Sequence, residues 1–296
     1  MNTFNPNKHR SQCEAYLGRY LDGSVRLIRA EQLTKSTRAA PWQLDVEVDG
    51  VARSYVLRAG ARRGEHEYHA LRAMESVPIP TPRAYGWEPE GEALGAPSFF
   101  CDFIAGESLL THMLAGKAWA EDLYIESVCA LQAVTREQVA TAADRFGGGE
   151  TAVDFLEAAF DYFKSNPHPL ADAVYARLKQ TMPPPPELRF SNGDLYADNL
   201  IVREQRLVGV IDFENAGFSD PMYEFLLPFF VHPELHGRGT EERYCRRMGF
   251  DPAALPWYNG LEYFDTWHWV AQTGQPFVHH TADSLCAALE HWLEQT

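Results

Sequence analysis

Two carboxylates and one carboxamide lie within a short stretch that follows the four prolines at 183–186. Asp194 belongs to a Gly-Asp pair, Asn199 lies five residues later at the start of a short apolar segment, and Asp212 ends the next apolar segment. Carboxylate and amide oxygens are the ligands that Mg²⁺ prefers, usually together with substrate phosphates. No cysteine or imidazole ligand is positioned with them, which disfavours zinc.

The spacing of these residues suggests how they meet. A hairpin of Leu200–Val202 with Leu207–Ile211 brings Asn199 and Asp212 to the same end, and Asp194 reaches that end through its loop. An Asp, an Asn five residues later and an Asp at the end of a following strand is the arrangement found in phosphoryl-transfer kinases.

Each of these residues also has an ordinary structural interpretation. Gly-Asp and Asp-Asn pairs are common in turns, and Asp220-Pro221 is a typical helix start. For any single residue this interpretation is at least as good as a catalytic one. The whole ordered set, placed after a β-rich half, favours the catalytic interpretation.

The elements that must position these residues fall into two groups. Before residue 106 the sequence predicts a helix at 12–21 and a strand at 25–29. It then predicts a hairpin of 44–48 with 54–58, a helix at 64–75 and a second hairpin of 84–88 with 98–104. After residue 106 helical spacing dominates, at 108–114, 122–139, 151–165, 170–182 and from 222 to the end. We therefore expect an α+β protein with a β-rich N-terminal lobe, 1–104, and a mostly helical C-terminal lobe, 105–296, with a ligand cleft between them.

Composition limits the partners. The chain of 296 residues carries 26 Lys and Arg against 41 Asp and Glu, a formal charge of −15, which argues against nucleic-acid binding. The negative charge is compatible with a cationic substrate, although solubility alone explains it as well. No apolar run is long enough to span a membrane and Met1–Arg10 is polar, so we expect a cytoplasmic protein without a membrane partner. The oligomeric state is not readable from the sequence.

The motif residues resemble those of the aminoglycoside phosphotransferase and choline kinase-like superfamily. Its pattern, roughly H-G-D-x-x-x-x-N, then I-D-[FW], then D-P, corresponds here to Asn192-Gly193-Asp194 through Asn199, Ile211-Asp212-Phe213 and Asp220-Pro221. The resemblance implies a protein-kinase-like two-lobed fold. It also implies a Mg²⁺-dependent kinase that moves the γ-phosphoryl group of ATP or GTP to a hydroxyl of a small molecule.

The resemblance assigns roles residue by residue. Asp194 is expected to accept or orient the proton of the substrate hydroxyl, and Asn199 and Asp212 are expected to hold Mg²⁺. Asp220 is expected to brace the loop. Charge stabilisation and positioning, rather than covalent chemistry, are what phosphoryl transfer requires.

The N-terminal half offers residues for the nucleotide. A kinase-like fold has a cation on its third strand, paired with an acid on the following helix, and the matching residues are Arg58, where Lys is usual, and Glu67. A surface ion pair of little energetic value is the alternative. Lys35, Ser36 and Thr37 lie in the expected phosphate-covering loop, although an exposed polar loop is the leading interpretation of this segment.

The adenine or guanine base is expected to meet backbone atoms of the segment between the lobes, near Asp102 and Ile104. Arg58 and Asn192 both depart from the usual pattern. They motivate a second hypothesis, a catalytically impaired nucleotide-binding pseudokinase of the same fold. A final group could either face a cationic substrate or form a helical core, namely Glu214, Glu262, Asp265 and Asp283 with Trp257, Tyr258, Tyr263, Trp267 and Trp269.

Overall fold

The computed structural model describes residues 4–33, 40–146, 149 and 151–296. The chain divides into two compact units that are each assembled from separate stretches of sequence. The first unit contains Met1–Ser108, Val134–Arg145 and Asn199–Ala216, and the second contains Leu109–Ala133, Phe146–Asp198 and Gly217–Thr296. Asn199 and Asp212 therefore belong to the first unit, and Asp194 belongs to the second.

An antiparallel sheet of order β1-β2-β3-β5-β4 forms the first unit's larger part. Its strands are β1 (Val25–Gln32), β2 (Trp42–Val48), β3 (Val51–Ala59), β4 (Ala84–Glu88) and β5 (Ser98–Asp102). The turn between β2 and β3 is Asp49-Gly50, whose φ angles of 49° and 83° are those of a two-residue type I′ turn. Both hairpins expected in this region are confirmed.

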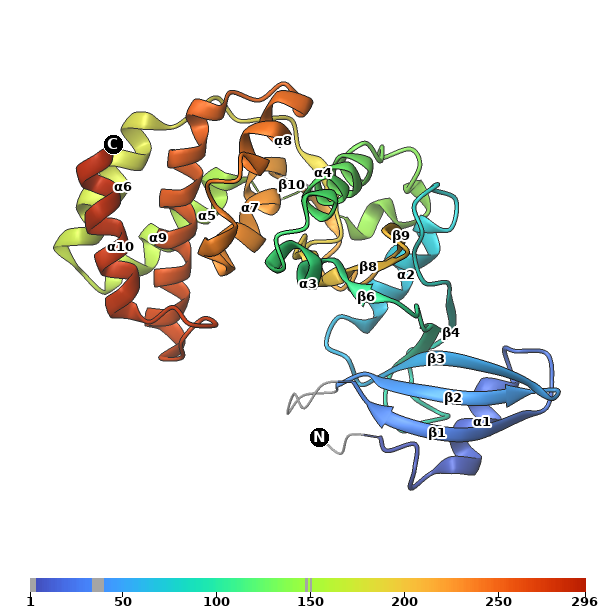
Figure 1. Cartoon of the computed structure of the whole chain (residues 1–296). Helices are drawn as coiled ribbons and strands as arrows, with labels where there is room; N and C mark the ends of the chain where they lie inside the picture. The colour runs from blue at the N-terminus through green and yellow to red at the C-terminus, as the bar shows by residue number, and fades with distance from the viewer. Residues whose placement is uncertain (1–3, 34–39, 147–148, 150) are drawn as a thin grey trace. The chain divides into compact units, whose positions relative to one another are not determined.

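The two faces of this sheet are covered by different helices. Adjacent residues of a strand point to opposite faces, and Phe100 packs against Tyr16 of α1 (Arg10–Gly18) while Phe99 packs against Tyr68 of α2 (Gly64–Met74). Figure 1 shows α1 beneath β1–β3. The face under α1 carries the apolar core of this unit, which includes Leu57.

A second, smaller sheet completes the first unit. Its order is β6-β8-β9, with β6 at Glu107–Ser108, β8 at Leu200–Arg203 and β9 at Arg206–Val210. The β8–β9 hairpin expected from the sequence is confirmed. The Val210 N–H donates to the Pro80 carbonyl at 2.8 Å, which joins this sheet to the connection between α2 and β4.

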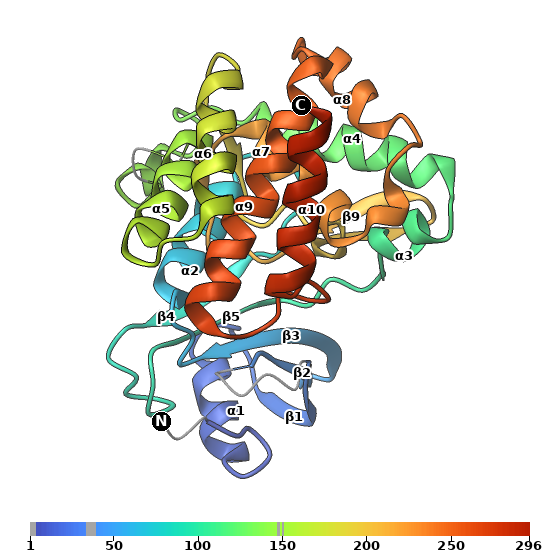
Figure 2. The ribbon, with the colours of Figure 1, turned by 90° about the vertical axis from the view of Figure 1, so that its left-hand side faces the viewer.

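The second unit is mainly helical. Its helices are α3 (Leu109–Leu114), α4 (Ala118–Gln132), α5 (Ala152–Ser165), α6 (Pro169–Thr181), α7 (Pro221–Val231), α8 (Thr240–Met248), α9 (Leu255–Thr273) and α10 (Ala282–Gln295). Helix α9 packs against α5, α6, α7 and α10, as Figure 2 shows for the bundle of α6, α9 and α10. A two-stranded sheet of β7 (Arg189–Ser191) and β10 (Gly217–Ser219) lies among the helices. In the described part of the chain, no helix is long and apolar enough to cross a membrane.

The α+β fold class is confirmed, but some expected boundaries are wrong. The helix expected at 122–139 runs from Ala118 to Gln132, because Val134 and Val139 continue the apolar spacing and are buried without being helical. Ser108, expected to begin a helix, belongs to β6. Strands β7 and β10 are only three residues long, too short for alternation to reveal them.

Candidate functional site

The loop that carries Asp194 begins directly after β7. Strand β7 pairs with β10 so that Ser191 lies opposite Gly217. Gly193 has a φ of 80°, a left-handed conformation that favours glycine, and its N–H donates to Ser191 Oγ at 2.8 Å. The chain thus turns sharply at Gly193, immediately before Asp194.

Asn192 braces the backbone of Asp194 from both sides. Its side chain is buried; Nδ2 donates to the Asp194 carbonyl at 3.1 Å, and Oδ1 accepts from the Asp194 N–H at 3.4 Å. Asn stands where the resemblance expects His, and it both donates and accepts here. The loop geometry before Asp194 is therefore supported by the residue present.

Neighbouring helices hold the same loop. Ser191 Oγ donates to Glu224 of α7 at 2.9 Å, and the Tyr124 hydroxyl of α4 lies 2.9 Å from the carbonyl oxygen of Leu195. Burial is the largest cause that raises the pKa of Glu224, and its hydrogen bond with Ser191 opposes the rise. Asp220 caps α7 by accepting from the Met222 N–H at 2.9 Å, which confirms that Asp220-Pro221 starts a helix.

Tyr196 and His232 form a contact that the sequence did not reveal. The Tyr196 hydroxyl lies 2.5 Å from His232 Nε2, and the two rings are stacked with centroids 5.9 Å apart. Burial, followed by the charges of Asp198 and Asp194, raises the pKa of Tyr196 to about 12. His232 follows the last residue of α7, so this pair ties the Asp194 loop to the end of that helix.

In the first unit, Asn199 and Asp212 lie at the same end of the β8–β9 hairpin. Leu200 pairs with Val210, and the Ile211 N–H donates to the Asn199 carbonyl at 3.0 Å. Asn199 therefore lies opposite Ile211, the residue directly before Asp212. Asp212 is half-buried and has a φ of 59°, a conformation that is uncommon outside glycine and more frequent for Asp and Asn. Such local strain often marks a functional position.

This donor set fits Mg²⁺. Among the described residues, no group of three or more His, Cys, Asp or Glu side chains is arranged to hold a metal ion. Mg²⁺ nevertheless binds commonly through one or two protein oxygens while phosphates and water complete its shell. The carboxylate of Asp212 and the amide oxygen of Asn199 match that mode.

Arg58 and Glu67 form an ion pair, and it is buried. Arg58 follows Leu57 on β3 and therefore points to the α2 face of the sheet, where Glu67 lies within the buried stripe of α2. Arg58 Nη2 is 2.6 Å from Glu67 Oε2, and the side chains are only 13% and 6% exposed. The alternative of an ordinary surface pair is therefore wrong.

Glu214 is a second partner of Arg58. Its Oε2 accepts from Arg58 Nη2 at 3.1 Å, and its side chain is 41% exposed. The sequence grouped Glu214 with acids that could face a cationic substrate, whereas it contacts a cation of the protein itself. The contact joins residues 156 positions apart, which explains why no local pattern revealed it.

The pKa directions in this cluster reflect its crowding. Burial lowers the pKa of Arg58, but Glu67, Asp212 and Glu214 together outweigh burial and raise it. Burial raises the pKa of Glu67 to about 7, the nearby Arg58 opposes the rise, and Asp212 and Glu214 add to it. Among the described residues, the Arg58 guanidinium thus lies near three carboxyl groups, those of Glu67, Asp212 and Glu214.

The other predicted nucleotide residues have different outcomes. Lys35, Ser36 and Thr37 lie outside the described residues. Asp102 extends the pairing of β5 with β4, since its N–H donates to the Arg83 carbonyl at 3.0 Å. The next N–H, of Phe103, donates to the Ser54 carbonyl at 3.1 Å, so neither amide offers its hydrogen to a base.

Ile104 lies beyond the end of β5 and packs over Gly209. A Cβ added at Gly209 would come within 2.7 Å of Ile104 Cγ2. Because Gly209 has no side chain, Ile104 can pack directly against β9 there.

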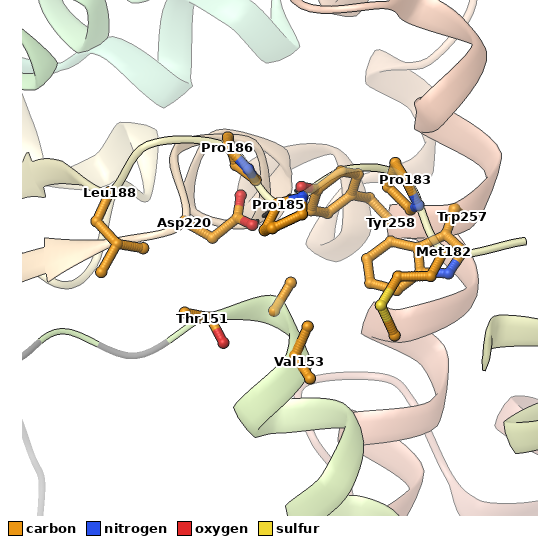
Figure 3. A pocket seen from close by; sticks show the side chains of 11 residues that line it. Thr151, Val153, Met182, Pro183, Pro185, Pro186, Leu188, Asp220, Trp257 and Tyr258 are labelled. Atoms are coloured by element: carbon orange, nitrogen blue, oxygen red, sulfur yellow. Dashed lines mark hydrogen bonds between the residues drawn. The ribbon is translucent and has the colours of Figure 1, made fainter.

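Two aromatic residues of the group in the helical unit, Trp257 and Tyr258, are buried and hydrogen-bonded within that unit. Trp257 Nε1 donates to the Leu178 carbonyl at 2.8 Å, and the Tyr258 hydroxyl donates to Asp220 at 2.9 Å. Figure 3 shows both aromatic side chains beside a small pocket that Pro183, Pro185 and Pro186 also line, with Asp220 hydrogen-bonded to Tyr258. This pocket is a packing gap around structural contacts.

Glu262 is different, because it is a buried acid near other acids. Burial raises its pKa well above the usual 4.5, Asp265 and Glu224 raise it further, and a hydrogen bond with Tyr223 opposes the rise. Tyr223 also donates to Asp265 at 2.9 Å. Burial and the neighbouring acids thus favour the neutral form of the Glu262 carboxyl inside the helical unit.

Comparisons with known proteins identify the family of this chain. The model of the phosphotransferase enzyme family matches residues 43–258. No curated protein sequence matches the chain.

Solved structures share the fold along the whole chain. A candidate aminoglycoside phosphotransferase from Ralstonia eutropha JMP134 is 18% identical with a TM-score of 0.74, and 97% of this chain and 98% of that chain are covered. A thermostable mutant of the aminoglycoside phosphotransferase APH(4)-Ia is 19% identical with a TM-score of 0.66, covering 95% and 98%. The kanamycin and GDP complex of APH(2")-IIIa is 17% identical with a TM-score of 0.64, covering 97% of each chain.

These likenesses confirm the expected protein-kinase-like fold. Because the family model also spans most of the sequence, the chain belongs to the phosphotransferase enzyme family.

Proposed function

We propose that this protein is a Mg²⁺-dependent small-molecule kinase that moves the γ-phosphoryl group of ATP or GTP to a hydroxyl of its acceptor. The observation that carries the proposal is the buried Arg58–Glu67 pair, 2.6 Å between Nη2 and Oε2. A strand-to-helix ion pair of this kind has to be in place for phosphoryl transfer in the kinase fold. Its formation with Arg in place of Lys favours an active enzyme over the pseudokinase alternative.

The first unit supplies the groups proposed to hold the nucleotide. Arg58 grips phosphate oxygens, and its planar guanidinium can do so through two hydrogen bonds. Asn199 and Asp212 would hold Mg²⁺, which when bound neutralises phosphate charge. The N–H groups of Asp102 and Phe103 are engaged within the protein, so the base is proposed to use backbone atoms from Ile104 onward.

The second unit supplies the proposed acceptor chemistry. Asp194 accepts or orients the proton of the acceptor hydroxyl, and Asn192 keeps the backbone of Asp194 in place through its two hydrogen bonds. Lobe 1–104 is proposed to bind the nucleotide and lobe 105–296 to carry the catalytic loop and the acceptor pocket, with Asn199 and Asp212 of the second lobe proposed to hold the Mg²⁺ of the nucleotide. Lys35, Ser36 and Thr37 remain proposed phosphate contacts.

The acceptor is proposed to be a small hydroxylated molecule. Similar structures contain hygromycin B or kanamycin together with ADP, AMP-PNP or GDP. The net charge of −15 is compatible with a cationic acceptor here as well. A cytoplasmic enzyme without nucleic-acid or membrane partners completes the proposal.

The experiment is a product screen by mass spectrometry. Purified protein is incubated with MgATP or MgGTP and a library of aminoglycosides, amino alcohols and sugars, with Asp194→Asn as the matched control. We expect one acceptor class to gain a single phosphoryl group with the wild type only. Mg²⁺-dependent nucleotide binding without any phosphorylated product would favour the pseudokinase, and a gain of nucleotide would indicate nucleotidyl transfer instead.

A further inference from the structure

Arg58 contacts two carboxylates, Glu67 and Glu214, whose side chains differ in how far they are exposed to solvent. Glu67 is 6% exposed and fixed within α2, whereas Glu214 is 41% exposed and lies in the segment after β9. Both contact the same nitrogen, Nη2, at 2.6 Å and 3.1 Å. Glu214 can turn into solvent at small cost, and Glu67 cannot.

Arg58 also retains an unused donor. Its Nε is buried and has no hydrogen-bond partner among the described residues. A buried donor without a partner is destabilising. A phosphate oxygen is an acceptor that could satisfy it, because guanidinium donors bind phosphate in pairs.

The charges around Arg58 come from every element packed against it. Glu67 lies on α2 and Asp212 and Glu214 follow β9, while the thiol of Cys101 on β5 is kept neutral by burial, which raises its pKa. One guanidinium therefore faces three carboxyl groups before any ligand arrives. A further anion can take its place there only if one carboxylate leaves or a cation accompanies it.

We propose that Glu214 occupies the place of a nucleotide phosphate on Arg58, so that binding is an exchange in which phosphate displaces the Glu214 carboxylate. This rests on the proposed function, because it assumes that Arg58 binds phosphate. The exchange breaks one charge-assisted hydrogen bond and leaves a free carboxylate beside the incoming anion. Glu214 thus weakens the binding of metal-free nucleotide and makes binding depend on Mg²⁺.

The test is calorimetric titration of ATP and of tripolyphosphate, each with EDTA and with excess Mg²⁺. The proteins are the wild type, Glu214→Gln and Glu214→Ala, with Glu90→Gln as a control that removes the same charge at an exposed position of the same unit. Without Mg²⁺, both Glu214 variants should bind ATP and tripolyphosphate about tenfold more tightly than the wild type. With Mg²⁺ the difference should shrink to about threefold or less, and Glu90→Gln should match the wild type throughout.

Four outcomes are separable. Tighter metal-free binding by both Glu214 variants supports the exchange, and so does binding seen only after Glu214 is replaced. If the wild type binds MgATP and the variants bind metal-free anions no more tightly, the exchange is wrong and the proposed function stands. If no protein binds ATP or tripolyphosphate under any condition while thermal melting shows folded protein, both fail.

Discussion

The two regions that carry the candidate site are held by opposite kinds of interaction. Around Arg58 in the first unit, contacts join full charges, and the same guanidinium nitrogen serves two carboxylates. Around Asp194 in the second unit, the backbone is held by neutral groups of Asn192, Ser191 and Tyr124, and the acid Glu224 reaches the loop through the Ser191 hydroxyl. Charged contacts can be exchanged for a charged ligand, whereas neutral hydrogen bonds to the backbone fix a geometry.

This difference suggests a division of labour. Under the proposed function, Arg58 changes partners when phosphate binds, and Asp194 acts on the acceptor proton from a fixed position. Arg58→Ala disturbs the first region, Asn192→Ala and Tyr196→Phe disturb the second, and Glu262→Gln changes a buried acid of α9 outside both.

Arg58→Ala should cause the largest loss. It leaves Glu67 buried without its cation, which typically costs about 3–5 kcal/mol. Burial raises the pKa of Glu67 to about 7 with Arg58 present, and removing Arg58 raises it further. At pH 6 and below the carboxyl is therefore mostly neutral in both proteins, and the loss should be smaller than at pH 8, where the wild-type pair is ionised. Urea unfolding at both pH values measures this, with the exposed Arg53→Ala on the same strand as control. If Arg58→Ala lowers the free energy of unfolding as little as Arg53→Ala does, the Arg58–Glu67 pair does not stabilise the fold.

Asn192→Ala should disturb the neutral region. It removes both side-chain hydrogen bonds to Asp194, and the expected loss is about 1–3 kcal/mol of stability. If the proposed function holds, phosphoryl transfer should fall by about 10–100-fold while nucleotide affinity is retained. Asn192→His, which can also donate and accept, should stay within about tenfold of the wild type. Loss of nucleotide affinity with unchanged transfer would contradict the assignment.

Glu262→Gln should make the protein more stable at high pH. The carboxyl binds its proton more tightly in the folded state, so its stabilising contribution is complete below pH 4.5 and is lost as the pH rises through the raised folded value. A permanently neutral Gln removes that loss, and we expect a gain of about 1–2 kcal/mol at pH 8 and none at pH 4.5. Thermal melting across this range measures it, with the exposed Glu290→Gln on α10 as control. A gain in stability that is independent of pH would contradict the raised pKa of the buried Glu262.

Tyr196→Phe should have the smallest effect. The hydroxyl contacts His232 in a half-exposed place, where water can replace it, so the stability loss should be about 1 kcal/mol or less. Urea unfolding measures this loss. A loss as large as that of Asn192→Ala would show that the loop depends on α7 more than on its own side chains.

Local patterns in the sequence predicted the local parts of this structure. Alternating strands and an Asp49-Gly50 turn predicted the β2–β3 hairpin, and apolar runs around 200–202 and 207–211 predicted the hairpin that brings Asn199 and Asp212 together. The pairing of Arg58 with Glu67 was anticipated from the resemblance. The structure adds that both side chains are buried.

Contacts between distant segments could not be predicted. Glu214 reaches Arg58 across 156 positions, and Tyr196 meets His232 across 36. Neither pair belongs to a repeating pattern, since each depends on how separate elements pack. The three-residue strands β7 and β10 were missed for the related reason that their pairing, rather than their composition, defines them.

The most direct test of the central claim compares Asp194→Asn with the wild type in two assays. One is MgATP affinity, and the other is the rate of γ-phosphoryl transfer to the acceptor identified by the product screen, or to water. We predict that transfer falls by about 10²–10⁴-fold while affinity changes by about threefold or less. Unchanged transfer, or an equal fall in affinity and transfer, would contradict the assignment of chemistry to Asp194.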